Sequence, residues 1–192
     1  MKKTLLIMLA VLLLFSFVSC KDSSDEIIAV YEEYKTTESI LYYAYNFINY
    51  DDETKTIDYT VDDKDDINTS YFSKLLDKLG IAESATITTF GGKIEGTYEE
   101  NDLEVEFKNV EIKYTVTGVE DEQTFKLSGT YKAVVTGEGD NRVRSTDYNF
   151  KLNDTEYSLA NTYNSDMKYS RAIVNGKNVE LRLLNSQIGY WA

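Results

Sequence analysis

From residue 84 onward, apolar and polar residues alternate along the chain with a period of two. This alternation places every second side chain on the same face of a strand, so it predicts β-strands with one face in a core. The alternating apolar positions form five groups: Leu103, Val105 and Phe107; Val110, Ile112, Tyr114 and Val116; Phe125, Leu127, Tyr131, Ala133 and Val135; Tyr148, Phe150 and Leu152; and Val179, Leu181 and Leu183. The parity changes between the first two groups, which predicts a β-bulge near Lys108 and Asn109.

Stretches rich in glycine, asparagine and acidic residues separate these strands and predict turns. The expected turns are Gly91-Gly92, Glu99 to Asp102, Gly118 to Glu122, Gly137 to Asn141, and Asn175-Gly176. Long strands joined by short turns indicate an antiparallel meander, and long strands twist and curve. We therefore expect a mainly β (α+β) domain, built as a sandwich, a bent sheet or a barrel-like sheet, with one or two short helices near the N-terminus.

The clearest helix is predicted over residues 69–79, where apolar residues form one stripe at helical spacing. Asn68 is placed to cap its start and Gly80 to end it. A second short helix is predicted over Ile27 to Tyr34.

Ser39 to Tyr50 is ambiguous. Leu41, Tyr45 and Ile48 have the spacing of a helix, whereas the many tyrosines and isoleucines suit a strand. The clean alternation in residues 55–61 favours a hairpin between the two segments.

The first residues have another pattern. Lys2 and Lys3 precede an uncharged apolar run from Leu5 to Val18. This run is shorter than the roughly 20 residues of a membrane-spanning helix. A basic start followed by an apolar stretch of this length is typical of a secretory signal peptide.

The apolar run ends in Phe17-Val18-Ser19-Cys20, and polar residues follow immediately. This ending resembles the lipobox of bacterial lipoproteins. In that family a diacylglycerol is attached to the cysteine thiol, and signal peptidase II makes that cysteine the new N-terminus. The resemblance covers residues 1–20 and implies lipidation of Cys20. It implies nothing about the family of the remaining chain.

Two alternatives stay open, namely ordinary cleavage after Cys20 and an uncleaved anchor. The cysteine count favours lipidation, because Cys20 is the only cysteine of the chain and therefore has no partner for an intramolecular disulfide. We expect a signal peptide over residues 1–19, the lipidated cysteine and a polar tether over residues 20–26, and a single mostly β domain over residues 27–192. The expected location is the cell envelope, at the outer membrane or cell surface, with the domain outside the cytoplasm.

Composition narrows the possible functions. The net charge is −13 and becomes −15 once Lys2 and Lys3 leave with the signal peptide, so we expect no nucleic-acid partner. The chain has no histidine, which removes the commonest general base and most zinc sites. We expect no cofactor.

The densest acidic run, Asp62 to Ser70, is the place where a metal site would have to lie. Four residues within this run and shortly after it have the spacing of positions one, three, five and twelve of a calcium-binding loop: Asp66, Asn68, Ser70 and Asp77. Tyr71 stands where that loop needs glycine, so we expect helix capping and solvated charge, and no metal site.

Two further features of the sequence are of a kind that can carry chemistry. Ser165-Asp166-Met167-Lys168 matches the short Ser-x-x-Lys pattern of penicillin-binding enzymes, but no Lys-Thr-Gly accompanies it. Trp191, the only tryptophan, is expected to pack in a final strand, with ligand stacking as the alternative.

The sequence therefore predicts a membrane-anchored lipoprotein whose β domain is not an enzyme and serves as a binding or structural module. Its expected partners are the membrane, through the lipid on Cys20, and an unidentified protein or small molecule. One alternative is a lipocalin-like or half-barrel carrier, which requires an enclosed apolar cavity. A lesser alternative is a hydrolase with carboxylate catalysis, which requires a carboxyl group with a raised pKa. An interaction module requires an exposed tyrosine-rich patch.

Overall fold

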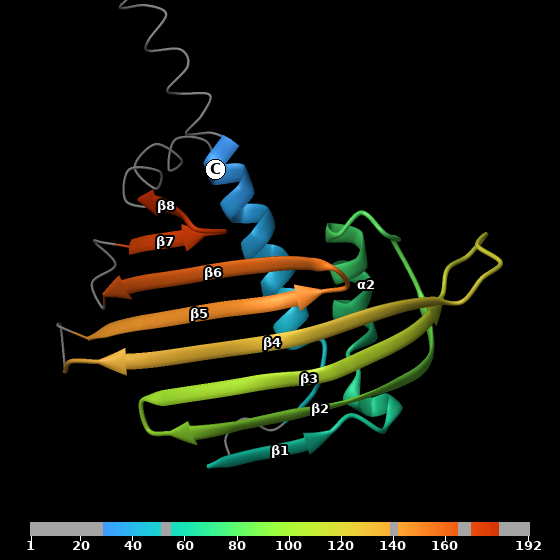
Figure 1. Ribbon diagram of the computed structural model, residues 1–192, viewed down its shortest axis with the longest axis horizontal. Coiled ribbons are helices and arrows are strands. Elements are labelled where there is room, and N and C mark those ends of the chain that lie inside the picture. The colour runs from blue at the N-terminus through green and yellow to red at the C-terminus, as the bar shows by residue number, and fades with distance from the viewer. Residues whose placement is uncertain (1–28, 51–54, 139–141, 165–169, 181–192) are drawn as a thin grey trace, which may run out of the picture.

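The computed structural model describes residues 29–50, 55–138, 142–164 and 170–180. Eight strands form one sheet in chain order, and each pairs antiparallel with the next. The strands are β1 Thr56–Thr60, β2 Thr86–Glu99, β3 Asp102–Thr115, β4 Gln123–Thr136, β5 Val143–Leu152, β6 Thr155–Asn164, β7 Ser170–Val174 and β8 Lys177–Glu180. Because β1 and β8 lie at opposite edges, the meander is open (Figure 1). The predicted mainly β fold is confirmed, and of its three forms the bent sheet is the one found.

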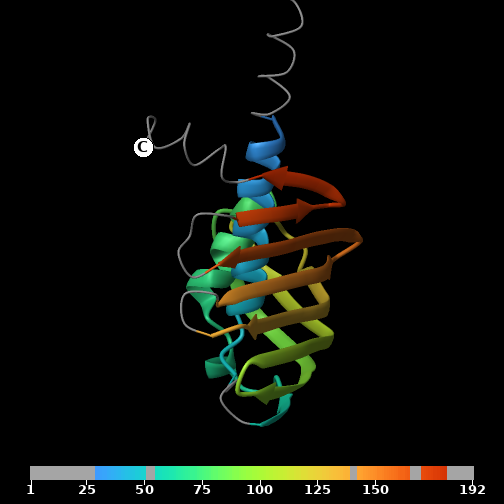
Figure 2. The same ribbon diagram turned by 90° about the vertical axis from the view of Figure 1, so that its left-hand side faces the viewer.

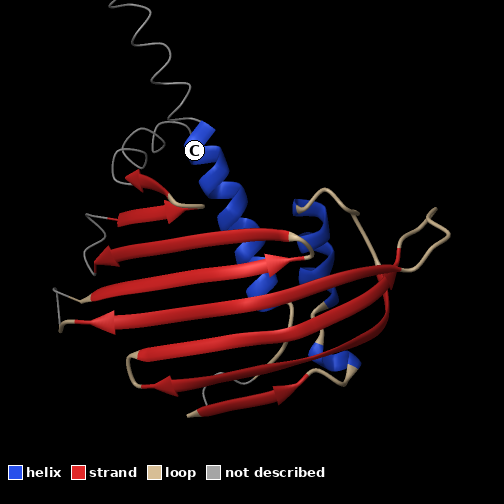
Figure 3. Cartoon of the chain, viewed as in Figure 1, coloured by secondary structure: helices blue, strands red, loops and turns tan. Residues whose placement is uncertain are grey.

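Two helices cross the same face of this sheet. One covers residues 29–46 and the other, α2, covers Thr69–Lys78. A short 3-10 turn, η1 at Lys64–Asp66, lies between β1 and α2. Viewed from the side, the helices stand on one side of the strands and the sheet bends around them (Figure 2). Seen from the front, they run across the strands (Figure 3).

The core lies between the sheet and the helices. Fully buried phenylalanines come from every part of this layer: Phe47, Phe72, Phe107, Phe125 and Phe150. The alternating apolar positions of β3, β4 and β5 point into it, whereas the residues between them are polar and form the outer face of the sheet. This pattern is the one expected of a sheet with one face in the core and one in solvent.

The bulge predicted from the parity change is confirmed. The pairing between β3 and β4 shifts between Phe107 and Val110. Asn109 has a φ of 50°, which is the left-handed conformation that asparagine tolerates better than most residues. The extra residue lets both halves of β3 keep their apolar side chains in the core.

The turn predicted at Gly91-Gly92 is wrong, because β2 continues through it. A Cβ atom on Gly92 would lie 2.6 Å from the Cα atom of Val110 on β3, so this glycine permits a close approach of two strands. Three of the other four predicted turns fall between strands. The fourth, Gly137 to Asn141, includes residues 139–141, which lie outside the described residues. A turn at Asn153-Asp154, between β5 and β6, was not predicted, and no glycine marks it.

The hairpin predicted for Ser39 to Tyr50 is also wrong. Residues 39–46 of this segment continue the helix that was predicted only as far as Tyr34, so one helix replaces a short helix and a strand. Buried positions occur with helical spacing: Tyr34, Thr37, Ile40, Leu41, Ala44, Phe47 and Ile48. Burial of this stripe outweighs the strand preference of tyrosine and isoleucine, and β1 pairs with β2 instead.

Helix α2 is confirmed with both of its predicted ends. The side chain of Asn68 accepts a hydrogen bond of 3.1 Å from the backbone N–H of Tyr71. Gly80 follows the helix with a φ of 68°, the left-handed conformation that commonly ends helices.

Candidate functional site

The outer face of the sheet is polar and carries ordered ion pairs. The Nζ atom of Lys93 lies 3.0 Å from a carboxylate oxygen of Asp58 and 2.5 Å from one of Glu95. Lys108 contacts Glu95 as well, at 2.5 Å. Hydrogen bonds from Lys108 and Lys93 lower the pKa of Glu95 to about 2. The exposed fractions of these side chains run from 35% to 65%, so solvent screens the ion pairs and they contribute little to stability.

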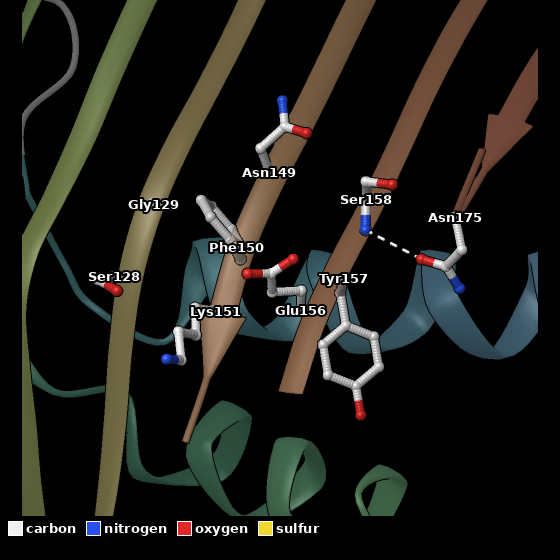
Figure 4. Close-up of a pocket in the computed structure, with 9 residues that line it drawn as sticks. All are labelled: Ser128, Gly129, Asn149, Phe150, Lys151, Glu156, Tyr157, Ser158 and Asn175. Carbon is white, nitrogen blue, oxygen red and sulfur yellow. Dashed lines mark hydrogen bonds between the residues drawn. The ribbon is translucent and has the colours of Figure 1, made fainter. Parts of the chain in front are cut away.

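A hollow of about 550 Å³ lies on this outer face over β4, β5 and β6. Its floor is backbone, because Gly129, Phe150 and Tyr157 stand opposite one another on the three strands. Its walls are polar side chains from the same strands and from the turn between β7 and β8: Ser128, Asn149, Lys151, Glu156, Ser158 and Asn175 (Figure 4). We call it the outer hollow.

Among the residues that line the outer hollow, Asn175 is held in place by side-chain hydrogen bonds on both sides. Its Oδ1 atom accepts a hydrogen bond of 3.1 Å from the backbone N–H of Ser158 (Figure 4). Its Nδ2 atom donates to Glu33 of the first helix at 3.2 Å, and the Nζ atom of Lys177 lies 2.8 Å from the same carboxylate. These hydrogen bonds lower the pKa of Glu33, that from Lys177 most strongly. The turn is thereby tied to the helix.

Lys151 and Glu156 differ from the paired charges elsewhere on the face. They are register partners on β5 and β6 and both line the outer hollow. Within the part of the chain that the structure describes, neither forms an ion pair. An ammonium and a carboxylate therefore remain available to a bound molecule.

A second candidate surface lies where the two helices meet. The ring centroids of Tyr42 and Tyr43 are 5.4 Å apart, and both lie within 6.0 Å of the ring of Tyr71 on α2. The Nζ atom of Lys74 is 5.6 Å from the centroid of Tyr71 and 5.8 Å from that of Tyr43. We call these four residues the tyrosine patch.

The tyrosine patch is accessible. Tyr42 is 48% exposed, the largest fraction among the exposed apolar and aromatic side chains of the described residues. A side-chain hydrogen bond with Tyr71 raises the pKa of Tyr42. Tyrosine is enriched at binding surfaces because it combines a large apolar ring with a polar tip.

The side of the sheet that faces the helices is filled by aromatic rings. Tyr45 of the first helix lies 4.4 Å from the ring of Tyr131 on β4, which lies 4.5 Å from that of Tyr148 on β5. Burial raises the pKa of Tyr148 well above its usual range. Phe107 and Phe150 continue this cluster at a centroid distance of 5.3 Å. Packed rings occupy the space in which a half-barrel carrier would hold its ligand.

The structure does not assemble the four residues with calcium-loop spacing into a metal site. The carboxylate of Asp66 accepts hydrogen bonds from the backbone N–H groups of Asp62 and Asp63, and from the hydroxyl of Tyr59. Asn68 caps α2, while Ser70 and Asp77 are exposed residues within it. Among the described residues, no group of three or more His, Cys, Asp or Glu side chains could hold a metal ion.

Carboxyl groups give no support to hydrolase chemistry in the described residues. Three of them have a pKa that is resolved as shifted, and all three are lowered: Glu33, Asp66 and Glu95. A general acid needs a raised pKa. Cys20 and its tether, residues 165–168 and Trp191 lie outside the described residues.

Sequence reasoning did not locate either surface. It places Tyr71 in the predicted helix over residues 69–79, but the segment of Tyr42 and Tyr43 stays ambiguous between helix and strand, so the three rings are not brought together. A helix over residues 39–50 would have placed Tyr42 off the buried stripe. The alternation in β5 does place Asn149 and Lys151 on the polar face, but β6, which supplies the other wall, was not predicted.

Comparison of the chain with protein-family models, with curated proteins and with solved structures finds no match. Of the helices within the described ranges, none has both the length and the apolar character needed to cross a membrane.

Proposed function

We propose that this chain is a bacterial lipoprotein, held at a membrane of the cell envelope through a lipid on Cys20, and that its β domain is a non-enzymatic module that binds a protein. The lipobox-like sequence that ends in Cys20 supports the anchor. Two or three acyl chains bind a membrane far more firmly than one, since each buried methylene contributes about 0.8 kcal/mol. The helix that starts the described domain begins nine residues after Cys20.

The tyrosine patch is the observation that carries the binding role. Three rings from two helices gather at the surface, although a solvated helix face usually carries charged residues. Tyrosine is one of the residue types enriched among the side chains that contribute most to binding energy at protein interfaces. We assign the patch to a protein partner with a complementary apolar and acceptor-rich surface.

The two alternatives have less support. A carrier needs an apolar cavity, and the ring cluster of Tyr45, Tyr131 and Tyr148 occupies the side of the sheet where it would lie. A hydrolase needs a carboxyl group whose pKa is raised. The carboxyl groups of the described residues whose pKa is resolved as shifted, Glu33, Asp66 and Glu95, all have a lowered pKa.

The anchor is tested by Cys20→Ser. This variant should incorporate no radiolabelled fatty acid and should leave the membrane fraction for the soluble fraction. The control is Cys20→Ser combined with Ser23→Cys, which keeps one thiol but moves it out of the motif. It should also stay unlabelled. Labelling and membrane association that survive Cys20→Ser would overturn the anchor.

The tyrosine patch is tested by photo-cross-linking in cells. Benzoylphenylalanine in place of Tyr42 should give a discrete cross-linked protein species. The matched control is the same replacement at Tyr98, which is 37% exposed on β2 and outside the patch. The species should be absent at Tyr98 and should be lost when Tyr71→Ser is added to the Tyr42 variant. Identical patterns at both positions, or no product at Tyr42, would contradict the assignment.

A further inference from the structure

The outer hollow continues into a second one on the same face. This second hollow has a volume of about 270 Å³ and lies over β3, β4 and β5, next to the bulge at Asn109. Ser128 and Lys151 line both hollows. The two hollows therefore adjoin at Ser128 and Lys151, and we call the pair of them the trough.

The lining residues of the trough extend across several strands. It reaches from Asn109 and Glu111 on β3 to Asn175, which directly follows β7. This distance corresponds to four strand spacings, about 19 Å. A site of this shape suits an extended chain better than a compact molecule.

The backbone that forms the floor of the trough restricts which kind of polymer can bind there. Gly129 and Phe150 belong to strands whose backbone is paired with a neighbour on both sides. Their N–H and C=O groups are therefore not free to pair with a peptide backbone, as they would be at a sheet edge. Recognition must come from side chains, and those of the walls are hydroxyls, amides and single charges: Ser128, Asn149, Ser158, Asn153, Lys151 and Glu156.

The charge of the trough and of the whole protein argues against an acidic polymer as the ligand. Within the trough the Nζ atom of Lys126 lies 3.7 Å from Glu111, Lys151 and Glu156 add one charge of each sign, and Asp154 adds a further negative charge. The lining of the trough therefore has a formal charge of −1, and the whole chain carries −13. A polyanion would be repelled by the molecule and would find no cluster of cations in the trough.

We infer that the trough binds a linear, uncharged, hydroxyl-rich polymer, that is, a neutral glycan chain. Ser128 and Ser158 offer hydroxyl groups that both donate and accept, as sugar hydroxyls do. Asn149 donates to Asp147 at 2.9 Å through Nδ2, which leaves its Oδ1 atom as an acceptor. This site lies on the outer face of the sheet, whereas the tyrosine patch lies on the helices, so it goes beyond the proposed function and does not depend on it.

The test is calorimetric titration of the full-length protein in detergent with neutral N-acetylglucosamine oligomers, from the monosaccharide to the hexasaccharide. Affinity should rise with oligomer length until the trough is filled. Ser128→Tyr, which fills the junction of the two hollows, should weaken hexasaccharide binding at least tenfold. Thr124→Tyr is the matched control, because Thr124 lies on the same face of β4 outside both hollows. It should leave the affinity unchanged.

Circular dichroism checks that each variant is folded, and Ser158→Tyr replaces Ser128→Tyr if the latter is not. If the monosaccharide binds with the same affinity as the hexasaccharide, the claim that a polymer binds along the trough is wrong. If an acidic galacturonic acid hexamer binds more tightly than the neutral hexasaccharide, the claim that the ligand is uncharged is wrong. Absence of heat with every oligomer, or a Ser128→Tyr protein that binds like the unaltered chain, would overturn the inference as a whole and leave the anchor and the tyrosine patch untouched.

Discussion

Asp66 has the sequence spacing of a calcium ligand, but its contacts in the structure give it a structural role. Its carboxylate accepts two backbone N–H groups, from Asp62 at 3.0 Å and from Asp63 at 2.8 Å, and the hydroxyl of Tyr59. Burial tends to raise its pKa, but these hydrogen bonds outweigh burial and lower it. Burial, followed by the bond to Asp66, raises the pKa of Tyr59 to about 12. The carboxylate therefore fixes the turn between β1 and α2.

Replacement of Asp66 by asparagine should lower the free energy of unfolding at neutral pH by about 1–3 kcal/mol, the usual cost of losing charged acceptors for protein donors. A lowered folded-state pKa stabilises the fold fully above the unfolded-state pKa of about 3.9, and this stabilisation is lost as the pH falls below it. The difference between the two proteins should therefore shrink between about pH 5 and pH 2 in urea titrations. Asp65→Asn, an exposed neighbour, should change stability by less than about 0.5 kcal/mol. A difference that grows in acid would contradict this role.

Single residues of the candidate sites were predictable only in part. The sequence shows that Asn68 is a cap and that acidic residues before a helix are usually solvated. It does not show that Asp66 meets Tyr59, because that contact depends on where β1 is placed. Nor does it show that Tyr42 meets Tyr71, because the contact joins two helices, and the segment that holds Tyr42 is ambiguous between helix and strand in the sequence.

At the scale of elements, close approach of strands shapes both the bend and the outer hollow. Gly129 on β4 has a φ of 133°, which side chains rarely adopt. A Cβ atom there would lie 2.1 Å from the carbonyl oxygen of Asn149 and 2.8 Å from the Cα atom of Phe150, both backbone atoms of β5. The strand cannot accept a side chain without moving its neighbour.

Gly129→Ala should therefore lower the free energy of unfolding by about 2–4 kcal/mol, through backbone strain and the clash with β5. Gly91→Ala is the matched control on β2. A Cβ atom there would have no neighbour within 4 Å, and its φ is not positive. It should cost less than about 1 kcal/mol. Urea unfolding measures both, and equal effects would show that the close approach does not constrain the sheet.

Elements were predictable where one periodicity dominates. Strands β3, β4 and β5 have clean alternation, and even the bulge in β3 follows from the parity. The first helix was not predictable in full, because its tyrosines and isoleucines favour a strand locally, and only packing against the sheet decides the outcome. Strand β6 was missed because Asn153, which makes its turn with a φ of 53°, is not a glycine.

At the scale of the whole molecule, helices and sheet share one core. Phe72 of α2 is fully buried and joins the layers. Its ring centroid lies 5.5 Å from those of Phe47 and Phe125, and 5.6 Å from that of Tyr114 on β3. Both surfaces proposed for binding are built on this frame, the tyrosine patch on the helices and the trough on the far face of the sheet. The trough could not be predicted, because it depends on which residues of neighbouring strands stand opposite one another.

A shared core predicts that the domain unfolds as one unit. Phe72→Ala should lower the free energy of unfolding by about 3–5 kcal/mol, from lost burial and the cavity that remains. Helix and tyrosine signals, followed by far- and near-ultraviolet circular dichroism in urea, should still change together in the variant. Tyr98→Ala, at an exposed position, should change the free energy of unfolding by less than about 0.5 kcal/mol. If the helix signal of Phe72→Ala disappears at lower urea than the tyrosine signal, the helices form a separate unit, and the two binding surfaces do not stand on one frame.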